Sequence, residues 1–147
     1  MTPSGFAESV SAVHASPYTP NRVYFGTYST STVNGIFVVD NANTGTSVTA
    51  TSITPAGSSG YPNCVVTGSS DQHLMAVYSN YNITNIWVSH NGGTTWSASD
   101  GNLPNMPVRW ALFHPDDNNK AYIATETGVW ETDLLNGSST VWVANPG

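Results

Sequence analysis

Short apolar runs recur along the whole chain, and clusters of Gly, Pro, Asn and Ser separate them. No window keeps a 3.6-residue apolar period, and the runs are rich in Val, Ile, Thr, Tyr and Trp, which is typical of strands. The pattern therefore predicts an all-β chain with about twelve strands and no helix. The predicted strands are Val10–His14, Arg22–Tyr28, Gly35–Val39, Ser47–Ile53, Asn63–Thr67, His73–Tyr78, Asn85–Ser89, Thr95–Ser99, Val108–His114, Ala121–Thr125, Gly128–Thr132 and Thr140–Ala144.

The predicted strands fall into three copies of one four-strand unit. The third strands of the copies begin at Gly35, Asn85 and Gly128 and read GIFVVD, NIWVSH and GVWETD. The fourth strands are aligned through residues 48, 96 and 142, which are 48 and 46 residues apart. The second strands are aligned at Val23, Leu74 and Tyr122. The aligned residues of the fourth strands are Val48, Trp96 and Trp142.

A repeat in the forties with four strands per unit is typical of a β-propeller blade. We expect one propeller segment over residues 1–147, with blades at about 9–54, 61–99 and 107–144. Each blade is an antiparallel meander whose apolar faces are covered only when neighbouring blades stack on them. A β-sandwich has a similar number of strands, but the regular 46–48-residue spacing disfavours it.

One turn carries the most specific motif in the chain. Between the third and fourth strands of the second unit the sequence reads SHNGGTTW, which contains Ser89, Asn91, Gly93, Thr95 and Trp96. The Ser and Asn side chains are expected to bond backbone amides across a tight hairpin, and the glycine to adopt a positive φ. The tryptophan then folds back onto the sheet. These features predict a structural turn that faces away from any ligand.

The motif resembles the Asp-box, or BNR repeat, Ser-x-Asp-x-Gly-x-Thr-Trp, with Asn91 at the Asp position. Degenerate versions begin at Asp40 and Asp133 in the other two units. The resemblance implies a propeller of the kind found in xyloglucanase-like glycoside hydrolases, sialidases, sortilin-type receptors and photosystem assembly factors. The run from Met106 looks most like repeats of large secreted bacterial proteins described as glycosyl-hydrolase-like. The resemblance therefore specifies a fold better than an activity.

Composition excludes several functional classes. Only three of the 147 residues are basic and nine are acidic, for a net charge of -6, so the chain cannot neutralise a nucleic-acid backbone. No apolar run approaches the ~20 residues that span a bilayer, and we expect no membrane insertion. Cys64 is the single cysteine, which excludes an internal disulfide and a thiolate zinc site. The four histidines lack metal-ligand spacing, so we predict no metal and no cofactor.

Candidate ligand-binding residues lie on one predicted rim, where the fourth-to-first and second-to-third connections of each unit meet. Tyrosines there can stack on sugar rings, and a lone arginine near the centre can pair with a carboxylate. Arg109 can equally pair with Glu126 of its own unit. The candidates are Tyr28, Tyr61, Tyr78, Tyr81, Asp100, Arg109, Trp110 and Glu126.

The sequence assigns no catalytic residue. A sialidase surrounds the substrate carboxylate with three arginines, whereas this chain has only Arg22 and Arg109. A glycoside hydrolase needs two opposed carboxylates, and Asp100 and Glu126 are the only pair on the predicted rim. The leading hypothesis is a non-catalytic module of a secreted or cell-surface bacterial protein that binds glycans or proteins, or serves as a scaffold. The alternative is part of a xyloglucanase-like hydrolase whose catalytic carboxylates lie partly outside this chain.

Three blades are too few to surround a channel, because propellers close with about four to eight. An open three-blade segment exposes one apolar face at each end, and such faces rarely remain bare. We therefore expect either a homodimer that closes a six-bladed ring or further blades in a longer chain. A small stand-alone protein that assembles into a ring with an unknown ligand is a third functional hypothesis. The N-terminal residues MTPSGFAESV show no leader pattern.

Overall fold

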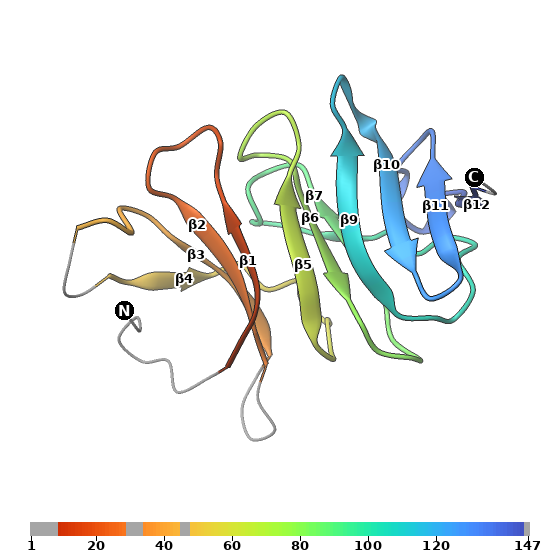
Figure 1. Ribbon diagram of the computed structural model, residues 1–147, viewed down its shortest axis with the longest axis horizontal. Helices are drawn as coiled ribbons and strands as arrows, with labels where there is room; N and C mark the ends of the chain where they lie inside the picture. The colour runs from red at the N-terminus through yellow and green to blue at the C-terminus, as the bar shows by residue number, and fades with distance from the viewer. Residues whose placement is uncertain (1–8, 29–33, 45–47, 146–147) are drawn as a thin grey trace.

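A computed structural model describes residues 9–28, 34–44 and 48–145, and within them it shows three four-stranded antiparallel sheets and no α-helix (Figure 1). The prediction of an all-β chain is confirmed. The first sheet contains β1 (Ser9–Ala15), β2 (Val23–Tyr28), β3 (Gly35–Val39) and β4 (Ala50–Ser52). The second contains β5 (Pro62–Thr67), β6 (Leu74–Tyr78), β7 (Ile86–Ser89) and β8 (Ser97–Ala98). The third contains β9 (Val108–His114), β10 (Asp117–Thr125), β11 (Gly128–Thr132) and β12 (Val143–Ala144), with a 3-10 turn at Gly137–Ser139 before β12.

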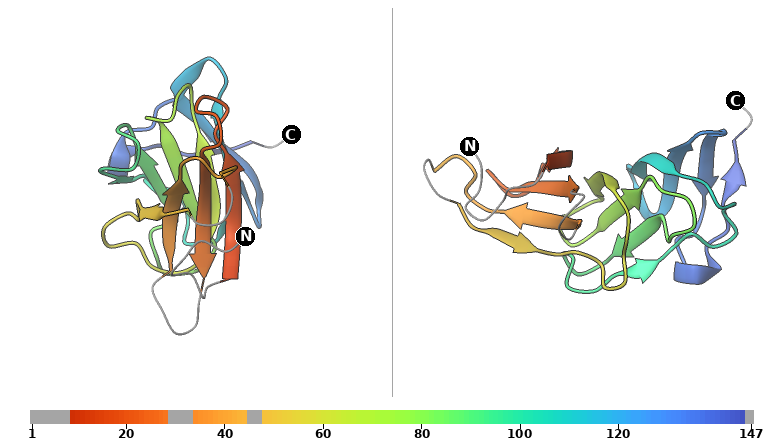
Figure 2. Two further views of the ribbon diagram at one scale, coloured as in Figure 1. Left: turned by 90° about the vertical axis from the view of Figure 1, so that its left-hand side faces the viewer. Right: turned by 90° about the horizontal axis from the view of Figure 1, so that it is seen from below.

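The three sheets stand in a row, as Figure 1 and the view from below in Figure 2 show. Each is a meander in which consecutive strands pair. The first strands β1, β5 and β9 lie side by side and run in the same direction, and their neighbours in the row are in contact. This is the arrangement of a propeller-like fragment. The first and third sheets lie at opposite ends of the row, so the described residues form no closed ring.

The pairing registers align the sheets residue by residue and correct one predicted alignment. Ala121 pairs with Thr132, just as Leu74 pairs with Ser89 in the second sheet. The second strand of the third unit is therefore aligned from Ala121, and the predicted start at Tyr122 was wrong by one residue. In a strand, a shift of one residue moves every side chain to the other face. Ala121 is accordingly fully buried, whereas Tyr122 is only half-buried.

The predicted alignment of the fourth strands was also wrong in the first sheet. Ser52, Ala98 and Ala144 pair with the equivalent aromatic residues of the third strands. The residues two positions earlier are therefore equivalent, and Ala50, not Val48, occupies the position of the tryptophans of the other two sheets. The paired fourth strands are also shorter than the predicted ones, with three residues in β4 and two each in β8 and β12. Ser47, where the first predicted fourth strand begins, lies outside the described residues.

Apolar clusters fill the spaces between neighbouring sheets. The cluster between the first and second sheets contains Ala12, Tyr24, Ile36, Val65, Leu74, Ala76, Tyr78 and Trp87. The cluster between the second and third sheets contains Cys64, Val66, Met75, Val77, Ile86, Val88, Val108, Ala111, Phe113, Ala121, Ile123, Leu135 and Trp142. The second sheet contributes one face to each cluster, which explains why β6 is buried along its whole length. Burial of apolar area on both faces is the main source of stability in this arrangement.

Trp96 and Trp142, which directly precede β8 and β12, join the second and third sheets to the sheet before each. The Trp96 indole N–H donates to the backbone carbonyl of Ile53, at 2.7 Å, and the Trp142 indole N–H donates to that of Ser99, at 2.9 Å. The two donors and the two acceptors are each 46 residues apart. At Gly101 any Cβ would collide with the backbone carbonyl of Thr140, so only glycine allows this close approach between the second and third sheets.

The turn between β7 and β8 has the hydrogen bonds expected from its residues. The Ser89 hydroxyl accepts from the Gly93 N–H at 2.9 Å, and the Asn91 carbonyl oxygen accepts from the Thr95 N–H at 2.8 Å. Gly93 has a φ of +86°, and a Cβ there would lie 2.8 Å from the Cβ of Ile53. The Trp96 indole also donates to the Gly93 carbonyl, so the turn and the indole form one unit.

A buried carboxylate that the sequence analysis did not single out joins the β5–β6 loop of the second sheet to the first sheet. Both this loop and the β1–β2 loop lie at the upper ends of the sheets in Figure 1. Asp71 is only 7% exposed, and its oxygens accept hydrogen bonds from Ser16 at 2.7 Å, Thr19 at 2.5 Å and Tyr24 at 2.9 Å. The Arg22 guanidinium lies 3.5 Å away. Burial raises the pKa of the Asp71 carboxyl, but these four donors outweigh burial and hold the pKa below its ordinary value.

Candidate ligand-binding rim

The predicted rim lies at the lower ends of the sheets in Figure 1, where β6 and β10 end and where the chain crosses to β5 and β9. We call this end of the molecule the lower rim. Its described segments are residues 54–61, 79–85, 101–107 and 126–127, together with the adjoining strand ends. Loops at one end of stacked sheets are a favourable place for ligand binding. The rigid strands hold the loops in place, so the loop sequences can vary without loss of the fold.

A cluster of three polar side chains spans the second and third sheets on the lower rim. The Tyr81 hydroxyl donates to Glu126 Oε2 at 2.7 Å, and Arg109 Nη2 donates to Glu126 Oε1 at 2.5 Å. Both bonds favour the charged carboxylate, and they lower the pKa of Glu126. Tyr81 is 54% exposed, and Arg109 and Glu126 are exposed too. The pairing of Arg109 with Glu126 is one of the two possibilities that the sequence left open.

Two further tyrosines meet on the lower rim between the first and second sheets. The rings of Tyr28 and Tyr61 form an edge-to-face pair with centroids 5.6 Å apart, and each residue is about 40% exposed. The Tyr61 N–H donates to Asn80 Oδ1 at 2.6 Å, which orders the chain just before β5. The pair presents aromatic surface to solvent while one ring supports the other.

A polar hollow of about 540 Å³ lies beside Tyr81 on the lower rim. Asn82 and Asn105 line it and are joined by two reciprocal bonds of 2.7 Å, in which each side-chain oxygen accepts from the other residue. The sequence analysis missed both residues, because asparagines are frequent in turns and a single one gives no signal. The lining residues are Asn82, Ile83, Thr84, Asn85, Asp100, Leu103, Pro104 and Asn105.

Asp100 lines this hollow, but its carboxylate is already engaged by the backbone. It accepts from the Asn85 N–H at 2.9 Å and from the Ile86 N–H at 2.7 Å. Thr54 does the same in the first sheet, where its hydroxyl accepts from the Ile36 N–H at 3.0 Å. Burial raises the pKa of Asp100, although these N–H donors act in the opposite direction. Asp100 therefore acts first as the cap of a strand.

Two of the predicted rim residues lie elsewhere. Tyr78 is fully buried between the first and second sheets, because the last residue of β6 still faces the core. Trp110 is 54% exposed, but it lies on the outer face of the third sheet. Its neighbour Ala111 points into the interface with the second sheet, and alternation along β9 turns Trp110 to the opposite side. Neither residue is part of the lower rim.

The described residues contain no helix with the length and apolar character that a membrane span requires. Within the same residues, no three His, Cys, Asp or Glu side chains gather closely enough to hold a metal ion.

Similarity to known proteins is found among solved structures. No protein-family model and no curated protein matches the chain. Among solved structures, the GH74 enzyme of Niastella koreensis is similar, with a TM-score of 0.66 and 17% sequence identity. The match covers 88% of this chain and 23% of that enzyme, so the chain spans less than a quarter of its structural neighbour. At this identity the similarity shows the propeller-like fold alone.

Proposed function

We propose that this chain is a non-catalytic, glycan-binding module of a secreted or cell-surface propeller protein, and that the lower rim binds the glycan. The observation that carries the proposal is the concentration on one rim of exposed tyrosine rings, a charged pair and an asparagine-lined hollow. Tyr28 and Tyr61 provide aromatic surface, and Tyr81, Arg109 and Glu126 provide donors and acceptors. The Asp-box resemblance of the turn at Ser89 and the GH74 neighbour both agree with a carbohydrate-related propeller.

The chemistry of this rim suits a neutral sugar chain. The C–H face of a sugar ring packs on tyrosine, while its hydroxyls exchange hydrogen bonds with amides and carboxylates. Asn82 and Asn105 offer both kinds of amide group beside Tyr81. A short oligosaccharide lying along the rim would contact both tyrosine groups through different sugar units. The hypothesis from the sequence also allows a protein ligand or a scaffold role, and either would apply if the rim binds no glycan.

The environments of the two rim carboxylates argue against hydrolysis by this chain alone. A hydrolase needs one carboxyl group that can protonate the leaving oxygen and a second that is free to attack or to activate water. Glu126 is held ionised by Tyr81 and Arg109, and Asp100 accepts backbone N–H groups. Neither group is free to act on a substrate without first losing these partners.

A second candidate function is part of a glycoside hydrolase whose remaining catalytic carboxylates lie outside this chain. The position of Asp100 beside a polar hollow favours it, and burial raises the pKa of Asp100, which is the direction that a general acid requires. The variant Asp100→Asn tests this candidate. In a longer protein that joins this chain to the remaining carboxylates, loss of hydrolysis with retained folding would favour it, whereas hydrolysis that the substitution leaves unchanged would reject it.

Binding to the rim is tested by titration calorimetry with xyloglucan and cellulose oligosaccharides, after a screen on a glycan array. We expect Tyr61→Ala and Tyr81→Ala each to weaken binding at least tenfold, an effect of about 1.4 kcal/mol. Tyr18→Ala is the matched control, because Tyr18 is 48% exposed and lies in the loop from β1 to β2, at the end of the sheets opposite the lower rim. Equal affinities for all three variants, or no glycan bound on the array, would reject the lower rim as a glycan site.

A further inference from the structure

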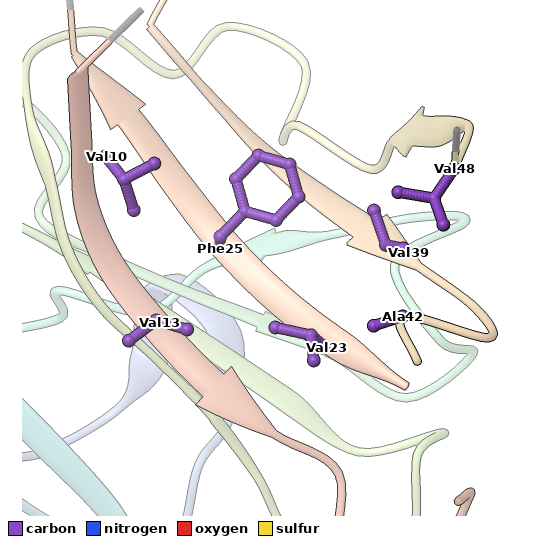
Figure 3. Close-up of a pocket in the computed structure, with 7 residues that line it drawn as sticks. All are labelled: Val10, Val13, Val23, Phe25, Val39, Ala42 and Val48. Atoms are coloured by element: carbon purple, nitrogen blue, oxygen red, sulfur yellow. The ribbon is translucent and has the colours of Figure 1, made fainter. Parts of the chain in front are cut away.

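Both ends of the row of sheets expose apolar surface. On the outer face of the first sheet, seven side chains surround a hollow of about 230 Å³, and Figure 3 shows them on one side of β1, β2 and β3. Val10 is 59% exposed and Val13 is 69% exposed there. The residues that line the hollow are Val10, Val13, Val23, Phe25, Val39, Ala42 and Val48. We call this surface the head face.

The outer face of the third sheet, at the other end of the row, is the tail face. It carries Trp110 at 54% exposure, together with Leu112, Val129 and Val143, all at least 45% exposed. The opposite side chains of β9, such as Ala111, are buried against the second sheet. Alternation along the strand therefore places one full apolar face in the core and the other in solvent.

The strand registers show which internal residues these two faces repeat. Val65 and Ala111 occupy the position of Val13, because all three pair with equivalent residues of the second strand of their sheet. By the same criterion, Ala12 and Cys64 occupy the position of Trp110. The tail face therefore corresponds to the side of each sheet that meets the next sheet in the chain. The head face corresponds to the side that meets the preceding one.

The internal interfaces show how such faces meet. Cys64 of the second sheet lies against Ala111 of the third, with its sulfur 3.9 Å from the Ala111 carbonyl oxygen. If this contact is transferred to the outer faces, Trp110 replaces Cys64 and Val13 replaces Ala111. We propose that the head face binds the tail face of a second copy of this chain, with Trp110 of one copy inserted beside Val13 into the hollow of the other.

The sizes of the side chains favour this pairing. Ala12 and Cys64 are small where Trp110 is large, and the hollow at the head face provides room for the larger indole. The first sheet also has Ala50 where the other sheets have a tryptophan, so no indole from β4 can clamp this face to a preceding sheet. The contact between copies thus differs from the internal interfaces in having its tryptophan on the tail side.

Two copies joined head to tail at both ends make a closed ring of six sheets. Six lies within the range of about four to eight blades with which propellers close, whereas three copies would give nine. A head-to-tail contact that closes by rotation buries both faces of both copies and leaves no apolar end exposed. This inference is independent of the proposed function, because the lower rim contributes no residue to the contact.

The test measures molar mass by light scattering at micromolar concentrations of the full chain. We expect twice the 15.6 kDa of one chain for the unaltered protein. Val13→Asp and Trp110→Lys should each give a monomer, because each variant places a charge in both contacts of the ring. Both side chains are exposed in the single chain, so each variant should keep its circular dichroism spectrum and melting cooperativity.

Mixing the two variants provides the decisive measurement. A mixed dimer has one unaltered contact, between Trp110 of the first variant and Val13 of the second, and one contact that pairs the new lysine with the new aspartate. We therefore expect the equimolar mixture to recover the dimer mass, while Tyr18→Lys, a control on an exposed loop, leaves the mass unchanged. A monomer for the unaltered chain, an assembly larger than a dimer, or a mixture that stays monomeric would each overturn the proposal.

Discussion

The two interfaces between neighbouring sheets have the same geometry, but different groups join them at their upper ends. Between the first and second sheets, the Asp71 carboxylate is only 7% exposed, and it accepts hydrogen bonds from three hydroxyls and pairs with a guanidinium. Between the second and third sheets, the neutral amide of Asn118 bonds Ser69 through its oxygen at 2.8 Å and through its nitrogen at 2.5 Å. One interface therefore depends on a charge and the other does not.

The tryptophans of the two interfaces also differ: the one at the second interface is the more deeply buried. Trp142 is 1% exposed, and its backbone N–H and carbonyl both bond the side chain of Asn102. Trp96 makes the equivalent indole bond to the preceding sheet but remains partly exposed. The comparison shows that the same stacking of sheets is supplemented by a buried indole at one interface and by a buried charge at the other. The two interfaces should therefore respond differently to mutation and to pH.

The largest effect is expected at the second interface. Trp142→Ala should lower the free energy of unfolding by about 4 kcal/mol, because it leaves a cavity and removes the indole bond to Ser99. Denaturant titration followed by intrinsic fluorescence of the remaining tryptophans measures the loss. Trp142→Phe is the control, since it keeps most of the volume and should cost clearly less. Equal losses for the two variants would show that the buried volume does not matter at this position.

The next largest effect is expected at the first interface. Asp71→Ala should cost about 3 kcal/mol, because three hydroxyls lose their shared acceptor while they remain at the interface, and Arg22 keeps only its pair with Asp40. Thermal unfolding at neutral pH measures it. Asp133→Ala is the control, because Asp133 has a 92% exposed side chain and pairs only with Lys120 among the salt bridges of the described residues. If the two variants have the same melting temperature, the Asp71 cluster does not stabilise the interface.

A smaller loss is expected for the partly exposed indole. Trp96→Ala should destabilise the protein by about 2 kcal/mol, roughly half the cost at Trp142, because less area leaves the core. The same denaturant titration compares the two variants directly. A cost at Trp96 that equals or exceeds the cost at Trp142 would contradict the ranking that burial predicts.

The smallest effect is the pH dependence of the first interface. The pKa of Asp71 is lower in the folded chain than its ordinary value of about 3.9, so its contribution is fully present above that value. The contribution is lost as the pH falls through the folded-state pKa, because the protonated group accepts the hydroxyl hydrogen bonds of Ser16, Thr19 and Tyr24 less well and no longer attracts Arg22 as an anion. Between about pH 5 and about pH 2, a range that contains the ordinary pKa of an aspartate, we expect the melting temperature of Asp71→Asn to fall less than that of the unaltered chain. Identical slopes would assign the acid sensitivity to other carboxylates.

Much of the lower rim was predicted from the sequence, but with instructive errors. Tyr28, Tyr61, Tyr81, Arg109 and Glu126 lie there because the ends of strands are marked by turn residues. The errors at Tyr78 and Trp110 arise because a residue at a strand end belongs to the rim or to a face according to the direction of its side chain. Tyr78 still faces the core at the end of β6, and Trp110 alternates with the buried Ala111. A bulge between Val108 and Trp110 also shifts the register of β9, and no local pattern marks it.

The Asp71 cluster and the Asn82–Asn105 pair could not be predicted from single positions. Each joins segments that are far apart in the chain: Asp71 lies 55 residues from Ser16, and Asn105 lies 23 residues from Asn82. An isolated aspartate or asparagine between strands is the ordinary composition of a turn. Their function emerges only when two sheets stack and bring two such turns together.

The order of strands and the unit of repetition followed from the sequence, because both depend on local physics. Alternation and β-branched residues specify strands, and the recurrence of Trp87 and Trp130 in equivalent third strands specifies the repeat. The faces that meet, the register of the second strand at Ala121 and the burial of each tryptophan were decided by tertiary structure. A strand has two faces of similar apolar character here, and only the stacking of neighbouring sheets determines which of them lies in the core.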